Sequence, residues 1–236
     1  MRGEPIGISP SPQQVEYVPL GGMYSTVDSL PAESLDTGSY LLAGPAMSGK
    51  YELLVDLLLE GLAAEEAGLL VTTNQDAHAV YEDFHNQTGA KTGNLRFVDC
   101  VSDQPGNPGP FDPDQVEYVS SPADLTGIGI GVSEQLRRFA EAEYRRMRIG
   151  FYSLSTLLMY AELETVFRFL HVLTGRIESI EGLGMFAIDP TTHDRSTINT
   201  LKQLYDGVIE LRAENDTREI RLVGIDDTAG EWVSQV

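Results

Sequence analysis

The stretch that decides the fold reads Ser39-Tyr40-Leu41-Leu42-Ala43-Gly44-Pro45-Ala46-Met47-Ser48-Gly49-Lys50-Tyr51. Its first five residues form a short, mostly apolar run of the kind that makes a buried strand. The residues from Gly44 to Lys50 fit the pattern G-x-x-x-x-G-K. Behind them, leucines recur with helical spacing at positions 53, 54, 57, 58 and 62. The stretch therefore predicts a strand, a tight turn bounded by glycines and a helix.

A turn of this pattern, placed between a strand and a helix, is a phosphate-binding loop in which backbone N–H groups surround the phosphate at the helix N-terminus. Lys50 would reach the terminal phosphates. The predicted binding residues are Gly44, Pro45, Ala46, Met47, Ser48, Gly49, Lys50 and Tyr51. The alternative is a glycine-rich turn that binds no ligand. Tyr51 departs from the pattern, because Mg²⁺ is coordinated by a Ser or Thr hydroxyl at this position and a phenolic oxygen lies too far from the backbone.

Strands and helices alternate along the rest of the chain. We expect strands over 69–73, 95–99, 148–154, 184–189, 207–211 and 220–224, and helices over 77–84, 132–147 and 163–177. This order predicts an α/β fold with a mainly parallel sheet, helices on both faces and an antiparallel C-terminal edge formed by a hairpin across 213–218. Residues 102–124 hold five prolines and are expected to form a long loop. Residues 1–23 read as an irregular leader before a single domain over 24–236.

The composition is acidic, with 36 Asp and Glu against 16 Lys and Arg and a net charge of −20. Free nucleic acid is therefore an unexpected partner, since binding it needs clustered cations. Only three of the basic residues are lysines, which is typical of salt-adapted halophilic proteins. A single cysteine, the lack of a signal sequence and the shortness of every apolar stretch predict a cytoplasmic protein that does not span a membrane.

Over most of residues 24–225, the chain resembles the RecA-superfamily ATPases of the KaiC/RadA/GvpD type. The similarity rests on 40–50, on Gly68–Thr73, on Arg148–Ser155, which resembles the Walker B strand, and on Asp206–Leu211, which is similar to the family's Asp-Gly-Val-Ile-x-Leu strand. A smaller haloarchaeal branch, RecA-like or HTR-like, is the part of the superfamily that the chain resembles. The resemblance implies ATP or ADP as ligand and ring-forming relatives.

The same resemblance indicates which catalytic groups are missing. The family's acidic pair after the second strand corresponds to Asn74 and Gln75, and its Walker B aspartate corresponds to Tyr152. Amides cannot serve as general bases, and Tyr152 and Tyr51 remove both anchors of the metal. We therefore expect no catalytic residue and no bound Mg²⁺. Asp76 or Asp189 could substitute if the alignment is shifted.

Other candidate groups have simpler interpretations. His78, Glu82 and His85 share one helix face and could hold a metal, but a solvated helix flank explains them. Arg137, Arg138, Arg145, Arg146 and Arg148 could reach a neighbouring subunit's nucleotide, yet Glu134–Arg138 and Glu141–Arg145 have the spacing of helical ion pairs. We interpret His171 and Cys100 as structural.

Three hypotheses follow. The first is a KaiC-like nucleotide-binding protein or pseudo-ATPase with a regulatory or scaffolding role, whose partner is an unidentified protein or further copies of the chain in a homo-oligomer. The second is a slow ATPase in signalling or recombination that uses Asp76 or Asp189. The third is an interaction domain that binds no nucleotide.

Overall fold

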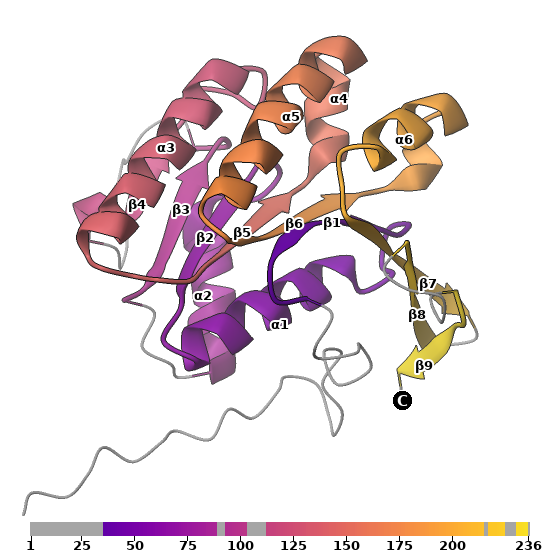
Figure 1. The fold of residues 1–236 in the computed structure, drawn as a ribbon, viewed down its shortest axis with the longest axis horizontal. Coiled ribbons are helices and arrows are strands. Elements are labelled where there is room, and N and C mark those ends of the chain that lie inside the picture. The colour runs from indigo at the N-terminus through magenta and orange to yellow at the C-terminus, as the bar shows by residue number, and fades with distance from the viewer. Residues whose placement is uncertain (1–34, 89–92, 103–111, 215–216, 225–229, 236) are drawn as a thin grey trace, which may run out of the picture.

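The computed structural model describes residues 35–88, 93–102, 112–214, 217–224 and 230–235 (Figure 1). The elements, in chain order, are β1 (Gly38–Ala43), α1 (Lys50–Ala63), β2 (Ala67–Thr72), α2 (Ala77–Thr88), β3 (Leu95–Asp99), the 3-10 helix η3 (Pro113–Gln115), β4 (Val116–Tyr118), α3 (Leu125–Glu141), β5 (Met147–Tyr152), α4 (Leu154–Tyr160), α5 (Leu163–Ser179), β6 (Leu183–Ile188), the 3-10 helix η4 (Pro190–Thr192), α6 (Arg195–Lys202), β7 (Gly207–Glu214), β8 (Thr217–Val223) and β9 (Val233–Gln235).

The strands form one sheet with the order β4-β3-β2-β5-β6-β1-β7-β8-β9. Every pair from β4 to β7 is parallel, and the β7–β8 and β8–β9 pairs are antiparallel. The predicted α/β fold with an antiparallel C-terminal edge is therefore confirmed, including the hairpin that joins β7 to β8. Because the central strands are buried on both faces, they read as continuous apolar runs rather than as alternating ones.

Two apolar cores lie on opposite faces of the sheet. The first lies under α1 and α2 and includes Leu53, Leu57, Val80 and Phe84. The second lies under α3, α4, α5 and α6, which cover the other face in Figure 1. The helices bury the apolar stripes that their sequences predict, so both faces of the sheet are shielded from water. This architecture places the ends of β1, β2, β5 and β6 along a single edge.

The helix predicted over 132–147 is wrong in its bounds, because α3 begins at Leu125 and ends at Glu141. Asp124 caps the helix by accepting a hydrogen bond from Gly127 N at 2.8 Å, which permits a start in a glycine-rich segment. Glu143 adopts a left-handed conformation (φ 61°) shortly after the helix ends. The strand expected over 148–154 likewise runs from Met147 to Tyr152.

Several short elements escaped the sequence analysis. The strand β4 and the 3-10 helix η3 lie inside the expected loop 102–124, so the prediction of a loop is wrong there; residues 103–111 of it lie outside the described part. The helices α4 and α6 and the edge strand β9 were also not predicted. Each has only three to eight residues, which is too short to establish a hydrophobic period. The predicted leader, 1–23, and the start of the domain at 24 also fall outside the described residues.

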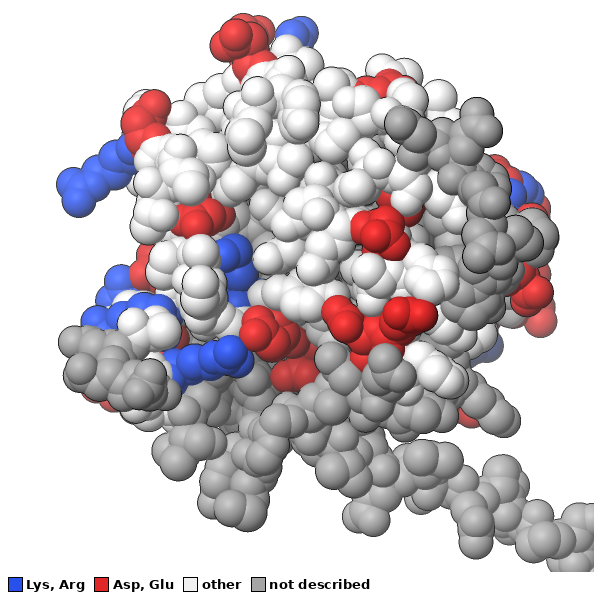
Figure 2. Space-filling model, turned by 180° about the vertical axis from the view of Figure 1, so that it is seen from behind, with Lys and Arg blue, Asp and Glu red and all other residues white. Residues whose placement is uncertain are grey.

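Seen from the side opposite to Figure 1, the molecule presents a broad uncharged area (Figure 2). Basic side chains gather at one edge of that face, whereas acidic ones are scattered across it. The face shown therefore carries no continuous basic surface of the kind that tracks a nucleic acid backbone. None of the helices in the described ranges combines the length and the apolar character that crossing a bilayer requires.

Candidate functional site

The loop between β1 and α1 has the shape that its sequence predicts. It lies at the carboxyl edge of the sheet, where Gly44 N donates to Ile188 O of the neighbouring β6 at 3.2 Å. Gly49 has a φ of 89°, a left-handed conformation that favours glycine. Gly44 is needed for a different reason, since a Cβ there would lie 2.3 Å from Ser48 Oγ. No side chain caps α1, so its first N–H groups face the loop with the positive end of the helix dipole.

Lys50 is the first residue of α1 and is only 7% exposed. Its Nζ donates to Pro45 O at 2.8 Å, so the side chain folds back over the loop. Among the described residues, no ion pair joins this Nζ to a carboxylate. Burial lowers the pKa of Lys50, while the charges of Asp189 and Glu52 act in the opposite direction. The loop therefore encloses a buried ammonium group that an anion would stabilise.

Ser48 adds a second polar group inside the loop. Its side chain is buried, and Ser48 Oγ has no hydrogen-bond partner in the described structure. A buried hydroxyl without a partner costs free energy that a bound ligand or water would recover. Together with Lys50, it gives the loop unsatisfied capacity for hydrogen bonding.

The two tyrosines that replace the expected metal ligands are in contact with each other. Tyr51 from α1 and Tyr152 from the end of β5 have ring centroids 4.9 Å apart and tilted by 53°. Tyr51 Oη also lies 3.5 Å from Asp83 Oδ2 of α2. Burial raises the pKa of both phenols, so both stay neutral near pH 7 and supply no anionic oxygen. The two residues at which the resemblance implies metal anchors are thus in ring contact with each other.

Asn74 belongs to the same cluster. Its side-chain amide lies near the Tyr152 phenol and lowers the pKa of that phenol against the larger effect of burial. The contact arises because β2 and β5 are neighbours: Thr72 pairs with Tyr152, and Thr73 Oγ1 accepts from Ser153 N at 2.8 Å. We call Tyr51, Tyr152 and Asn74 the aromatic cluster. Gln75, the other residue of the expected acidic pair, is exposed, as is Asn74.

The two alternative carboxylates have different surroundings. Asp76 caps α2, since its Oδ1 accepts from Ala79 N at 2.8 Å. Asp189 follows β6, and its Oδ1 accepts from Thr191 N at 2.9 Å. Of the two carboxylates, only Asp189 is close enough for its negative charge to raise the pKa of Lys50. Asp189 is therefore the carboxylate better placed to face a ligand of the loop.

Arg218 lies at the loop and was missed by the sequence analysis. Its Nη2 lies 3.1 Å from Glu52 Oε1, in the first turn of α1. Ile220 and Leu222 of β8 point into the core beside α1. Arg218 lies two residues before Ile220 and therefore on the same face of the strand. The period-2 alternation of β8 could have indicated this face, but not that it ends beside Gly49.

The histidines and the cysteine that the sequence singled out contact neighbouring side chains and form no ligand site in the described ranges. His78 Nδ1 lies 3.7 Å from Glu82 Oε1, and His85 stacks on Tyr81. No group of three or more metal-ligating side chains occurs in the described ranges. Cys100 is buried, and its pKa is raised to about 12. Burial is the larger cause, and the negative charges of Asp99 and Asp124 add to it. His171 stacks on Phe167.

The arginine cluster divides into two groups of ion pairs. Arg138 pairs with Glu134 at 3.0 Å, as predicted, but Glu141 pairs with Arg137 instead of Arg145, because α3 ends at Glu141. Arg146 and Arg148 both pair with Glu66. They flank the start of β5, at the amino end of the parallel strands and so at the edge opposite to the loop.

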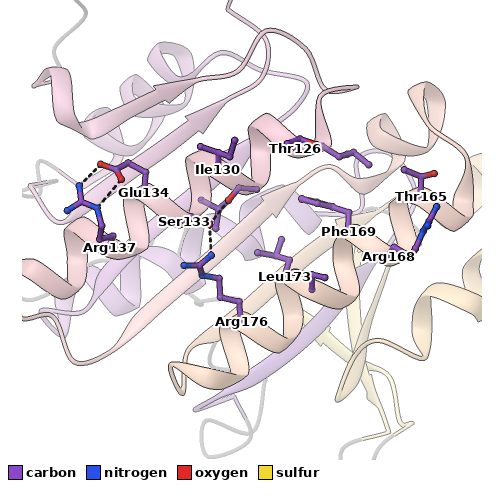
Figure 3. Close-up of a pocket in the computed structure, with 14 residues that line it drawn as sticks. Thr126, Ile130, Ser133, Glu134, Arg137, Thr165, Arg168, Phe169, Leu173 and Arg176 are labelled. Atoms are coloured by element: carbon purple, nitrogen blue, oxygen red, sulfur yellow. Dashed lines mark hydrogen bonds and ion pairs between the residues drawn. The ribbon is translucent and has the colours of Figure 1, made fainter.

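A groove of about 860 Å³ lies between α3 and α5, away from the loop. Figure 3 shows Phe169 and Leu173 of α5 facing α3, with Arg176 bonded to Ser133 across the groove. The other two arginines of its rim are Arg137, paired with Glu134, and Arg168, 3.8 Å from Glu164. Carboxylates pair with these two arginines, whereas Arg176 donates to the neutral hydroxyl of Ser133.

Residues 37–211 match the sequence profile of a family described as a family of unknown function, DUF7504. The match spans more than half of the chain. The chain belongs to this family. No curated protein matches this DUF7504 member significantly.

The structure of the DUF7504 member is similar to a crystal structure of the KaiC-like protein PH0186 from the hyperthermophilic archaeon Pyrococcus horikoshii OT3. The TM-score is 0.64, the sequence identity is 13%, and the match covers 93% of this chain and 94% of that chain. At this identity the likeness shows the fold alone. It confirms the fold expected from the sequence, a KaiC-like RecA fold.

Proposed function

We propose that this chain is a KaiC-like protein that binds the phosphates of ATP or ADP in the Gly44–Tyr51 loop without hydrolysing them, and that it acts as a regulatory or scaffolding protein. The observation that carries the proposal is Lys50: the residue is only 7% exposed, its ammonium folds over the phosphate loop onto Pro45 O, and it has no carboxylate partner in the described ranges. A buried cation of this kind is stabilised by an anion.

The aromatic cluster supports the loss of hydrolysis. Phosphoryl transfer relies on a metal that neutralises the γ-phosphate and on a base that orients the attacking water. Neutral phenols stand at both metal-anchoring positions, and the amide of Asn74 lies near Tyr152 where a carboxylate would act. These residues do not fit Mg²⁺, so no step through a metal is included in the proposal.

Isothermal titration calorimetry with ADP and ATP tests this function, with either EDTA or MgCl₂ in the buffer. We expect binding in EDTA, loss of binding in Lys50→Ala, and unchanged binding in Lys202→Ala. Lys202 is a suitable control because its Nζ is already paired with Glu210 Oε1 at 3.0 Å, in α6 and β7. If neither nucleotide binds, or if Lys50→Ala binds as well as the original chain, the proposal is wrong and an interaction domain without nucleotide is the better description.

A slow ATPase is the second candidate, and the position of Asp189 favours it. The negative charge of this carboxylate raises the pKa of Lys50, so the two side chains are near each other. Asp189 could therefore act as a general base on a water that lies between them. Phosphate release from ATP in MgCl₂ should then exceed that of Lys50→Ala and fall to the same background in Asp189→Asn. Turnover of this kind would replace the proposal of a non-hydrolysing protein.

A further inference from the structure

The side chain of Arg218 lies on the phosphate loop itself. A Cβ on Gly49 would be 3.1 Å from Arg218 Cδ, 3.3 Å from Nη1 and 3.4 Å from Nε. The guanidinium therefore packs against the residue at which the loop enters α1. A Cβ at this position would crowd the arginine side chain, and Gly49 is also held in the left-handed conformation that favours glycine.

The present partner of this guanidinium is easily exchanged. Arg218 and Glu52 are 44% and 51% exposed, and a pair so open to water contributes little to stability. A phosphate group offers the same bidentate geometry with more charge, so it competes well for an arginine. Glu52 thus occupies Arg218 in the ligand-free protein without holding it tightly.

The loop also carries two independent signs that a ligand belongs in it. Lys50 is a buried cation whose one described hydrogen bond goes to the neutral Pro45 carbonyl, and Ser48 Oγ is buried with no partner. Lys50 and Arg218 approach the same helix N-terminus from two sides, one from within the loop and the other from β8 across Gly49. Two cations of this kind can replace the charge that a metal would otherwise supply to the phosphates.

The geometry points to Arg218 as a second phosphate-binding residue that leaves Glu52 when a metal-free chain of two or more phosphates enters the loop. This inference rests on the proposed function and names its ligand class. The shared chemistry is a diphosphate, from either a nucleotide or inorganic pyrophosphate. Because Mg²⁺ neutralises the phosphate charges that Arg218 would meet, the metal-free form should bind more tightly than the Mg²⁺ complex.

Calorimetry with ADP and with inorganic pyrophosphate, in EDTA and at the lowest KCl concentration that keeps the chain folded, tests the inference. We expect Arg218→Gln to weaken binding about tenfold, as for the loss of a hydrogen bond to a charged group. Arg218→Lys should keep part of the affinity. The matched control is Arg212→Gln, an arginine of the same hairpin that pairs with Glu219 instead of the loop, which should bind within about twofold of the original chain.

Glu52 gives a second readout that a purely structural arginine would not produce. Glu52→Gln should tighten binding, and this gain should be smaller in the Arg218→Gln background because no ion pair remains to be broken there. Binding of ADP alone would assign the site to nucleotides, and binding of both probes would show that the diphosphate suffices.

The outcomes separate the two proposals. Binding that Lys50→Ala abolishes but Arg218→Gln leaves unchanged, or strengthens, would overturn this inference and leave the proposed function intact. A protein that binds neither ADP nor pyrophosphate would overturn both.

Discussion

The contact between Tyr51 and Tyr152 can be measured as a coupling energy. The rings come from α1 and β5 and have centroids 4.9 Å apart. Each is partly buried against the core beneath α1, so either single change to Ala should destabilise the fold by about 1–3 kcal/mol. An aromatic pair at this distance contributes about 0.5–1.5 kcal/mol beyond the area that it buries. The double variant should therefore lose less stability than the sum of the two single losses, by about 1 kcal/mol.

Urea unfolding in KCl, followed by circular dichroism, gives the four free energies of unfolding that this cycle needs. In thermal melts the same coupling amounts to about 2–4 °C for a chain of this size. A matched control combines Tyr51→Ala with Tyr205→Ala, because Tyr205 packs on Phe186 in the core on the other face of the sheet. That pair should be additive within about 0.5 kcal/mol. A Tyr51–Tyr152 coupling below about 0.3 kcal/mol would refute the aromatic cluster.

Three further predictions concern charge and burial. The net charge of −20 should make the melting temperature rise by about 5 °C or more between 0.1 M and 2 M KCl, because the screening length falls from ~10 Å to below ~3 Å. Cys100, whose pKa burial raises to about 12, should resist maleimide labelling at pH 8 until the chain is unfolded. Burial lowers the pKa of Lys50, so affinity for ADP should decline as the pH rises, and should do so before an ordinary lysine loses its proton.

Each of these has a contrary result. Equal melting temperatures in dilute and concentrated KCl would show that self-repulsion does not limit stability. Complete labelling of Cys100 in the folded protein within minutes would show that it is accessible. Constant ADP affinity up to pH 10 would show that Lys50 keeps the pKa of an exposed lysine or does not contact the phosphates.

The sequence was sufficient for the features that depend on long periodic segments. The central strands, the helices α1, α2 and α5 and the hairpin after β7 follow from hydrophobic period and turn signals. The loop from Gly44 to Lys50 was predicted from its pattern and its place between strand and helix. Short elements such as β4 and α6 offer too few residues for a period, and α3 was misplaced because Gly127, Gly129 and Gly131 concealed its start.

The candidate site could be predicted residue by residue but not as a set of contacts. Tyr51, Asn74 and Tyr152 each departed from the expected chemistry, yet their meeting depends on β2 lying next to β5, which only the strand order reveals. The placement of Arg218 depends on long-range packing in the same way. Nothing local in the sequence of β8 indicates that this arginine packs on Gly49 and pairs with Glu52.

The central claim is that the loop holds phosphates while the aromatic cluster excludes the metal. Crystals soaked with ATP and MnCl₂ test it most directly, because manganese is located by its anomalous scattering. The account predicts phosphate density enclosed by residues 44–51, the Tyr51–Tyr152 contact retained, and no manganese peak beside Tyr51. A manganese ion bound there between the phosphates and the protein, or a loop that stays empty, would contradict it.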